Sequence, residues 1–169
     1  MEGEKRRAVF LDRDGVIFYP VKKEGTNSAW KEKGKTRAPF SVTELLKVGG
    51  VVPHAEAVLR SLRERGFLTI LVTNQPDITY GNLSREEWER IQAYATALPF
   101  DDVFVCFHGR DDGCDCKKPR PGMLLEAAHK WGIDLATSYF VGDTESDTGA
   151  AYAAGCKSIL IDALYNHGL

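Results

Sequence analysis

The sequence lacks a long hydrophobic run, and no apolar stretch approaches the roughly 18 residues that a membrane-spanning helix needs. Residues 1–7 are polar and charged, so the apolar core of a secretory signal peptide is absent as well. From both absences we expect a cytoplasmic protein with no membrane partner.

An excess of charge of either sign is also lacking. The 22 basic and 24 acidic residues leave a net charge of −2. A chain so balanced has no overall electrostatic attraction to nucleic acid or to anionic membranes. Any preference for a charged ligand must therefore come from a local group of side chains.

Cysteine is scarce, but three of the four cysteines cluster. Cys106, Cys114 and Cys116 lie within eleven residues, and His108 stands among them. The pattern C-x-H, five residues, C-x-C matches the Cys₃His composition of closed tetrahedral zinc sites, which leave no open position for a substrate. We predict a structural Zn²⁺ in a loop over residues 106–118; unrelated thiols or a transient disulfide are the alternatives.

Short apolar runs alternate with helical patterns along the chain, which predicts an α/β fold with a mostly parallel sheet. The length of 169 residues favours one domain over 1–169. Ser84 with Glu87 suggests a capping box, and Pro53 suits a first helical turn. The expected strands are 8–11, 67–72, 103–107, 139–141 and 158–161, and the expected helices are 53–65, 84–98, 121–131 and 145–154.

The connection 19–52 is long and basic, with Lys22, Lys23, Lys31, Lys33, Lys35 and Arg37. Such a connection in a compact domain is usually functional or partly disordered. Two interpretations stay open, a solvated basic flap and a flap that contacts a substrate phosphate. The segment is too short for a separate cap domain.

Two acids, Asp12 and Asp14, directly follow the first apolar run. Parallel strands end at one edge of a sheet, so this strand would deliver both carboxylates into a crevice there. Two close carboxylates repel each other, which calls for a cation, and Mg²⁺ prefers oxygen ligands. The alternative is an Asx-rich turn in which Gly15 supplies a positive φ.

Further polar residues are expected at the same edge. Thr73 and Asn74 end the second strand, where a hydroxyl and main-chain N–H groups could bind phosphate oxygens. Asp143 ends the fourth strand, and Asp147 follows one helical turn later, where a carboxylate can ligate Mg²⁺ or hold a lysine. Strand propensity and the helix dipole are the simpler explanations of these positions.

The pair Lys117 and Lys118 comes directly after the cysteine cluster. A lysine held by a metal-pinned loop can place its ammonium against a phosphoryl group or between carboxylates. A basic turn bounded by prolines is the alternative.

This ordered set resembles the haloacid dehalogenase-like (HAD) phosphatases over about residues 8–162. The motifs DRDGVI, TNQ, the C-x-H…C-x-C loop with its Lys-Pro pair, and VGDxxxD are similar to subgroup IIIA, which contains heptose bisphosphate and histidinol phosphatases. The resemblance implies a three-layer, doubly wound, Rossmann-like sheet without a separate cap, and a Mg²⁺-dependent phosphomonoesterase.

The resemblance also implies roles for single residues. Asp12 would be the nucleophile that forms an aspartyl phosphate, and Asp14 the general acid and then base. Mg²⁺ would bind the side chains of Asp12 and Asp143 and the main-chain carbonyl of Asp14. The phosphoryl group would contact Thr73, Asn74 and Lys118, with Asp147 and Lys117 in support.

The sequence departs from the subgroup at two places that bear on the substrate. Relatives carry an arginine in the turn that corresponds to residues 76–82, where this chain reads PDITYGN, and Lys117 replaces another arginine, which loses a bidentate fork. We expect a small phosphorylated metabolite, with a sugar phosphate or bisphosphate such as heptose 1,7-bisphosphate ahead of histidinol phosphate. A nucleic-acid 3′-phosphatase and a zinc-stabilised binding module are the other hypotheses. We expect a monomer, and dimer formation through 19–52 stays open.

Overall fold

The computed structural model describes residues 5–22 and 36–161 of the chain. Its centre is a five-stranded sheet in the order β5-β4-β1-β6-β7, in which every neighbouring pair is parallel. Each strand lies within two residues of its predicted position. The strands are β1 (Arg7–Leu11), β4 (Phe67–Asn74), β5 (Asp102–Cys106), β6 (Tyr139–Gly142) and β7 (Lys157–Leu160).

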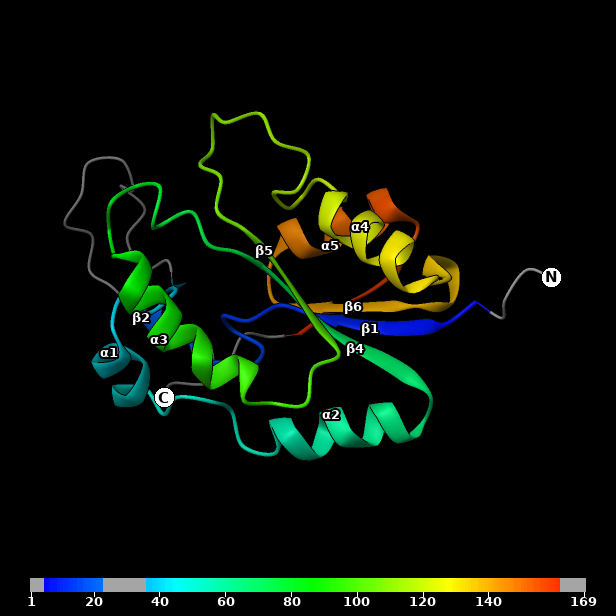
Figure 1. Ribbon diagram of the computed structural model, residues 1–169, viewed down its shortest axis with the longest axis horizontal. Coiled ribbons are helices and arrows are strands. Elements are labelled where there is room, and N and C mark those ends of the chain that lie inside the picture. The colour runs from blue at the N-terminus through cyan, green and yellow to red at the C-terminus, as the bar shows by residue number, and fades with distance from the viewer. Residues whose placement is uncertain (1–4, 23–35, 162–169) are drawn as a thin grey trace.

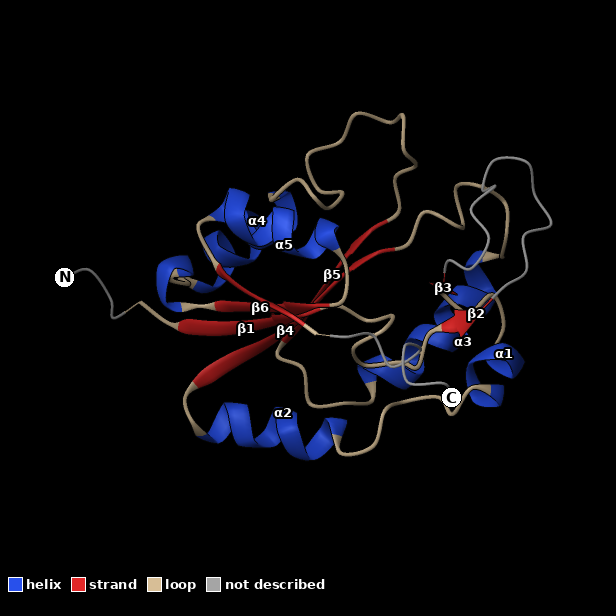
Figure 2. Cartoon of the chain, turned by 180° about the vertical axis from the view of Figure 1, so that it is seen from behind, coloured by secondary structure: helices blue, strands red, loops and turns tan. Residues whose placement is uncertain are grey.

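Helices cover both faces of this sheet. In Figure 1, α4 (Gly122–Trp131) and α5 (Glu145–Ala154) lie above it and α2 (Ala55–Glu64) lies below it. The view from behind in Figure 2 shows the same three layers. Helix α3 (Arg85–Thr96) packs on the α2 side through its buried Ile91 and Ala95. The predicted doubly wound α/β architecture is confirmed.

The side chains of β1 alternate between two cores. Ala8 and Phe10 pack with α4 and α5, whereas Val9 and Leu11 pack with α2 and α3. A strand buried on both faces reads as a continuous apolar run, which is why β1 is visible in the sequence. Phe10 meets Phe140 of β6 edge to face, with ring centroids 6.4 Å apart.

The helix boundaries follow the predicted signals with two differences. The Ser84 side chain accepts the main-chain N–H of Glu87 at 3.1 Å, as a capping residue does. The Glu87 carboxylate, however, accepts the N–H of Val42, so it ties two segments together. Helix α2 begins at Ala55 rather than at the predicted residue 53, after His54 in the left-handed conformation (φ 64°).

The connection 19–52 contains more structure than we predicted. It holds the short antiparallel strands β2 (Val21–Lys22) and β3 (Thr36–Arg37) and the helix α1 (Val42–Lys47). Its lysines at 23, 31, 33 and 35 lie outside the described residues, so the interpretation of the flap stays a prediction. A six-residue helix is marginal by itself, and α1 depends on the fully buried Leu45 and on the hydrogen bond to Glu87.

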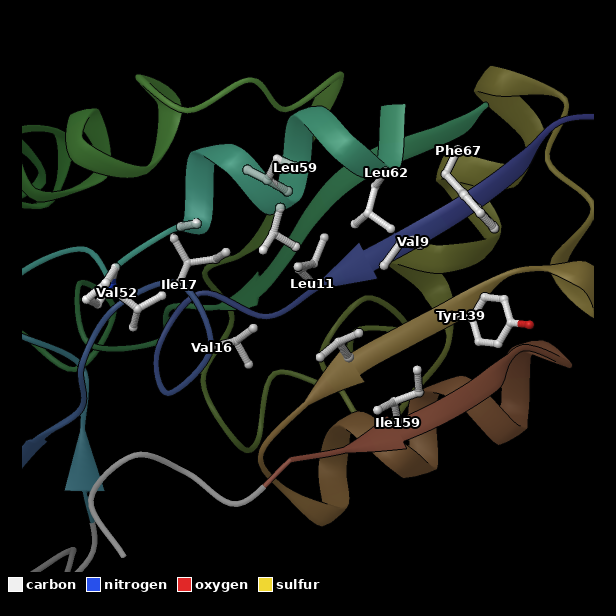
Figure 3. Close-up of a pocket in the computed structure, with 14 residues that line it drawn as sticks. Val9, Leu11, Val16, Ile17, Val52, Leu59, Leu62, Phe67, Tyr139 and Ile159 are labelled. Carbon is white, nitrogen blue, oxygen red and sulfur yellow. The ribbon is translucent and has the colours of Figure 1, made fainter. Parts of the chain in front are cut away.

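An apolar cavity of about 540 Å³ lies between α2 and the sheet. Figure 3 shows Leu59 and Leu62 of α2 facing Val9, Leu11 and Tyr139 of the strands. The described side chains that line it include no carboxylate, thiol, imidazole or ammonium group. The chemistry of the molecule must therefore be sought elsewhere. Within the described parts of the chain, no helix is long and apolar enough to cross a membrane.

Candidate active site

The carboxyl edge of the sheet gathers the predicted residues because of the strand order. Strand β1 is central, the chain builds outward to β4 and β5 on one side, and it then builds to β6 and β7 on the other. In open α/β sheets a crevice forms where the winding reverses in this way. Leu11 pairs with both Leu71 and Val141, so Asp12 leaves β1 between the ends of β4 and β6.

Lys118 lies between two carboxylates at this edge. Its Nζ is 2.9 Å from Oδ1 of Asp12 and 2.6 Å from Oδ1 of Asp147. It also donates to the carbonyl of Val72 at 3.3 Å. All three charged side chains are buried, with residue exposures of 4% for Lys118, 8% for Asp12 and 1% for Asp147. One ammonium is thus shared by two buried acids, which is one of the two placements that the sequence suggested for this lysine.

The charges of this group are unbalanced, and the titration behaviour reflects it. Burial raises the pKa of Asp12 to about 7; Lys118 opposes the increase and the neighbouring carboxylates, Asp147 first, add to it. Burial also raises the pKa of Asp143 to about 6, again with a contribution from Asp147. Burial would lower the pKa of Lys118, but Asp12 and Asp147 outweigh it and hold that pKa above its usual value. Lys118 therefore neutralises these carboxylates only in part, and a further cation among them would be stabilised.

The arrangement of the acids fits a divalent cation. Asp12, Asp143 and Asp147 each offer a carboxylate oxygen, and these oxygens lie within 4.8 Å of one another. Oδ1 of Asp143 is buried and has no hydrogen-bond partner. Hard cations such as Mg²⁺ take oxygen ligands of this kind. The residues present therefore fit Mg²⁺.

Gly15 makes room for Asp143. It has a φ of 91°, and a Cβ at this position would lie 2.1 Å from Oδ2 of Asp143. Gly15 has the positive φ that the alternative of an Asx-rich turn required, but a second reason for glycine is the close approach of Asp143, which lies 128 residues away in the sequence. No local pattern could have indicated it.

Asp147 is a positioning group in this structure. Its Oδ2 accepts the main-chain N–H of Thr144 at 3.1 Å, the Thr144 hydroxyl at 2.8 Å and the N–H of Asp143 at 3.2 Å. Its Oδ1 faces Lys118. Asp147 therefore caps the start of α5 and holds the lysine at the same time.

Asn74 and Lys117 contact the loop that precedes α4. The Asn74 amide donates to the carbonyl of Lys118 and accepts its N–H, both at 3.1 Å. Lys117 donates to the carbonyl of His108 at 3.0 Å. The Asn74 side chain thus holds the main chain of Lys118, and the phosphate contact that we predicted for Asn74 concerns its main-chain N–H.

A buried network around Asp14 was not predicted from the sequence. The side chain of Arg13 is fully buried and binds both oxygens of Asp14, and Gln75 bridges Asp14 to the hydroxyl of Thr73. The one available signal was an arginine between two acids in an otherwise apolar stretch. Periodicity does not say whether such an arginine points outward or inward.

The predicted zinc ligands converge at the end of β5. Sγ of Cys106 is 3.8 Å from Sγ of Cys114 and 3.2 Å from Sγ of Cys116, and Nδ1 of His108 is 3.2 Å from Sγ of Cys116. Zn–S bonds of about 2.3 Å place tetrahedral sulfur ligands about 3.8 Å apart, close to these separations. Burial and the adjacent thiols raise the pKa of Cys116 to about 12. Three thiols and an imidazole that converge in this way fit Zn²⁺.

The sequence profile of the haloacid dehalogenase-like hydrolases matches residues 19–155. The chain belongs to this family.

Among sequence relatives, the D-glycero-beta-D-manno-heptose-1,7-bisphosphate 7-phosphatase of Vibrio cholerae is 34% identical over 161 residues, which cover 88% of this chain and 76% of that enzyme. The enzyme of the same name from Pseudomonas putida is 30% identical over 161 residues, covering 92% and 82%. The one from Pseudomonas aeruginosa is 34% identical over 116 residues, and this match spans 65% of each protein.

Among solved structures, the D,D-heptose 1.7-bisphosphate phosphatase of B. bronchiseptica, complexed with magnesium and phosphate, is similar with a TM-score of 0.70. Its sequence is 29% identical, and the match covers 96% of this HAD chain and 88% of that protein. The fold is therefore shared over almost the whole length, including the edge that holds the acids.

Proposed function

We propose that the protein is a Mg²⁺-dependent phosphomonoesterase that hydrolyses a small phosphorylated sugar, with heptose 1,7-bisphosphate as the leading substrate. The observation that carries the proposal is the buried Asp12–Lys118 pair beside Asp143, whose Oδ1 has no partner. The names of the sequence relatives support the choice of a sugar bisphosphate.

Asp12 is the proposed nucleophile. One of its carboxylate oxygens attacks phosphorus, the bond from phosphorus to the ester oxygen breaks, and an aspartyl phosphate forms. Lys118, 2.9 Å away, favours the ionised form of Asp12 and offsets charge on the transferring group. Asp147 keeps the ammonium in place through its 2.6 Å contact.

Asp14 is the proposed general acid and base. Its carboxyl proton passes to the leaving alkoxide, and the resulting carboxylate then takes a proton from the water that hydrolyses the aspartyl phosphate. The Thr73 hydroxyl and the main-chain N–H of Asn74 are the proposed contacts of the phosphoryl oxygens.

Asp12, Asp143 and the main-chain carbonyl of Asp14 are the proposed ligands of Mg²⁺. When bound, the ion would supply positive charge against the phosphoryl oxygens. Cys106, His108, Cys114 and Cys116 are the proposed ligands of a structural Zn²⁺, which would hold the loop that carries Lys118.

The turn at 76–82 is where the substrate preference is expected to differ from that of the relatives. It is closed by the Asn82 amide, which donates to Asp77 at 2.8 Å, and the Tyr80 hydroxyl accepts the N–H of Arg110 in the cysteine loop at 2.7 Å. The turn therefore contacts the loop over residues 106–118. We propose that Tyr80 and Lys117 take part in recognising the sugar end of the substrate.

We further propose that residues 1–169 form one catalytic domain without a separate cap, and that the enzyme is a cytoplasmic monomer.

A phosphatase screen with Mg²⁺ tests the proposed function. Heptose 1,7-bisphosphate, hexose phosphates, histidinol phosphate, nucleotides and 3′-phosphorylated DNA are ranked by kcat/KM, with Asp12→Asn as the matched blank. We expect the sugar bisphosphate to rank first. A higher rank for histidinol phosphate or for DNA would overturn the substrate, and release of phosphate from none of the substrates would favour a zinc-stabilised binding module.

A further inference from the structure

Arg13 carries a guanidinium that is fully buried directly behind the catalytic edge. Nε donates to Oδ1 of Asp14 at 3.2 Å, and Nη2 donates to Oδ2 of Asp14 at 3.1 Å. The fork therefore binds both oxygens of one carboxylate. Such bidentate pairs restrict the orientation of the carboxylate in addition to attracting it.

Two glutamines complete the surroundings of this guanidinium. Nη1 donates to Oε1 of Gln92 at 2.9 Å, and Nη2 donates to Oε1 of Gln75 at 2.8 Å. The Gln75 amide in turn donates to Oδ2 of Asp14 at 2.7 Å and to the Thr73 hydroxyl at 2.9 Å. Asp14 is thus held by three donors, although its side chain keeps 18% of its surface exposed toward the site.

The same residue also contacts the proposed nucleophile. The main-chain N–H of Arg13 donates to Oδ1 of Asp12 at 2.8 Å. Arg13 therefore binds the first acid through its backbone and the second acid through its side chain. Arg13 thus contributes to the placement of both carboxylates, together with Lys118 at Asp12 and Gln75 at Asp14.

A purely structural role would not need this arrangement. A buried guanidinium costs a large desolvation free energy unless it is paired and hydrogen-bonded, and an apolar side chain of similar size would pack without that cost. Here the charge is paired with a side chain at the site rather than with one in the core. The cost is understandable if the orientation of Asp14 matters for the reaction.

We propose that Arg13 is a positioning residue that, with Gln75, holds the Asp14 carboxyl group for proton transfer to the leaving oxygen. This inference rests on the proposed function. In the step concerned, Asp12 forms the new bond to phosphorus, the bond to the ester oxygen breaks, and the proton of Asp14 goes to that oxygen. Arg13 exchanges no proton and touches neither substrate nor phosphorus.

The experiment compares two leaving groups, because only one of them needs the proton. The alkoxide of a sugar phosphate must be protonated as it leaves, whereas the nitrophenolate of p-nitrophenyl phosphate leaves without help. We define the ratio as kcat/KM for the sugar phosphate divided by kcat/KM for p-nitrophenyl phosphate. This constant reports the steps up to formation of the aspartyl phosphate and excludes its hydrolysis.

The variant Arg13→Lys keeps the positive charge but loses the fork. We expect it to lower the ratio by about 10- to 100-fold, since misplacing a general acid forfeits much of its contribution. A ratio unchanged from wild type, with both rates reduced equally, would show a structural role and overturn the proposal.

Two further variants separate the possible causes. Gln92→Met removes a partner of Arg13 that does not touch Asp14, so it should lower stability and lower the ratio less than Arg13→Lys does; a larger fall than in Arg13→Lys would contradict a role of Arg13 through Asp14. Asp14→Asn removes the proposed acid itself, so it gives the largest fall in the ratio that a misplaced Asp14 could cause. If Asp14→Asn itself leaves the ratio unchanged, the proposed acid fails, whereas a fall in Asp14→Asn but not in Arg13→Lys overturns only the inference about Arg13.

One more variant, Gln75→Met, tests the proposal in the case that Arg13→Lys does not fold. Gln75→Met removes the 2.7 Å hydrogen bond to Oδ2 of Asp14 and leaves the buried charge pair in place. It should lower the ratio in the same direction by a smaller factor. An unchanged ratio in Gln75→Met would then count against the positioning network.

Discussion

At the carboxyl edge of the sheet, negatively charged side chains outnumber positively charged ones, and burial together with this imbalance determines the pKa values of single residues. Lys118 is the one ammonium among the described residues that lies between Asp12 and Asp147, and Asp143 adds a half-buried carboxylate whose buried Oδ1 has no hydrogen-bond partner. Buried acids that exceed their cationic partners raise one another's pKa and attract a cation. The expected consequences can be measured one side chain at a time.

The first expected consequence concerns the nucleophile. Asp12→Asn should reduce phosphatase activity at least about 10⁴-fold, because removal of the nucleophile from a covalent catalyst leaves only residual rates. The fold should persist, since asparagine has the same shape and removes a buried charge. Phosphate release and circular dichroism check both parts, and robust turnover by this variant would remove Asp12 from the nucleophilic role.

The second consequence concerns Asp143 and pH. Its pKa is raised to about 6, so the folded metal-free protein binds more protons than the unfolded chain between about pH 4 and 6, and stability falls as pH rises through this window. Asp143→Asn has no carboxyl group to ionise at this position, so its free energy of unfolding does not fall for this reason. Without metal at pH 8, we expect the variant to be more stable than wild type by on the order of 1–2 kcal/mol, after allowance for partial exposure.

Urea unfolding of both proteins at pH 4 and pH 8 measures this difference. Added Mg²⁺ should reverse the order at pH 8, because it stabilises the wild-type carboxylate and has fewer ligands in the variant. A wild type that is more stable than Asp143→Asn without metal at pH 8 would contradict the assignment.

Among the structural elements, the cysteine loop and α4 act together. The N–H of Gly122, the first residue of α4, donates to the carbonyl of Asp115 at 2.9 Å, and a Cβ on Gly122 would lie 2.3 Å from that oxygen. Lys118 lies in the connection between the cysteines and the helix, clamped by Asn74. A metal that holds the loop therefore also holds the lysine.

Loss of Cys116, a proposed zinc ligand, tests this coupling. We expect Cys116→Ser to lower the free energy of unfolding by more than about 3 kcal/mol, because loss of a structural metal is among the changes with large effects. Activity should fall with it, since the loop that carries Lys118 loosens. Bound zinc, urea unfolding and kcat are the measurements.

Cys156→Ser is the matched control for that change. Cys156 is also buried, but it lies next to β7 and outside the cluster, so its loss should leave zinc content and kcat unchanged. Equal stability and full activity of zinc-free wild type would contradict a structural role for the metal.

The whole molecule joins two apolar cores through one sheet and carries little net charge. A net charge of −2 provides no long-range attraction to a polyanion. Among the described residues, the charged groups of the site are buried or half-buried, and they are screened by salt less than surface charges are. Recognition of the substrate should therefore depend weakly on ionic strength.

Between about 50 and 200 mM salt, kcat/KM for the sugar phosphate should change less than about threefold, whereas binding through many nucleic-acid phosphates would fall by about 10³–10⁵. The same titration with 3′-phosphorylated DNA is the comparison. A steep salt dependence together with efficient hydrolysis of the DNA end would favour the nucleic-acid hypothesis.

The strands and most helices could be predicted from the sequence because their signals are local. Continuous apolar runs indicate strands buried on both faces, and Ser84 marks a helix start. Helix α1 was not predicted, since six residues give no usable period and its hydrogen bond to Glu87 spans 45 residues.

By itself, the sequence determined which chemical groups reach the edge of the sheet, because strand ends and the spacing of ligands can be recognised from short stretches of consecutive residues. The tertiary structure alone decided how those groups are used. Asp147 became a clamp for Lys118, Asn74 bound a main chain, and Arg13 turned inward onto Asp14. The physical reason is that hydrogen bonds and ion pairs depend on distances between segments far apart in the chain, and burial then determines the strength of each pair.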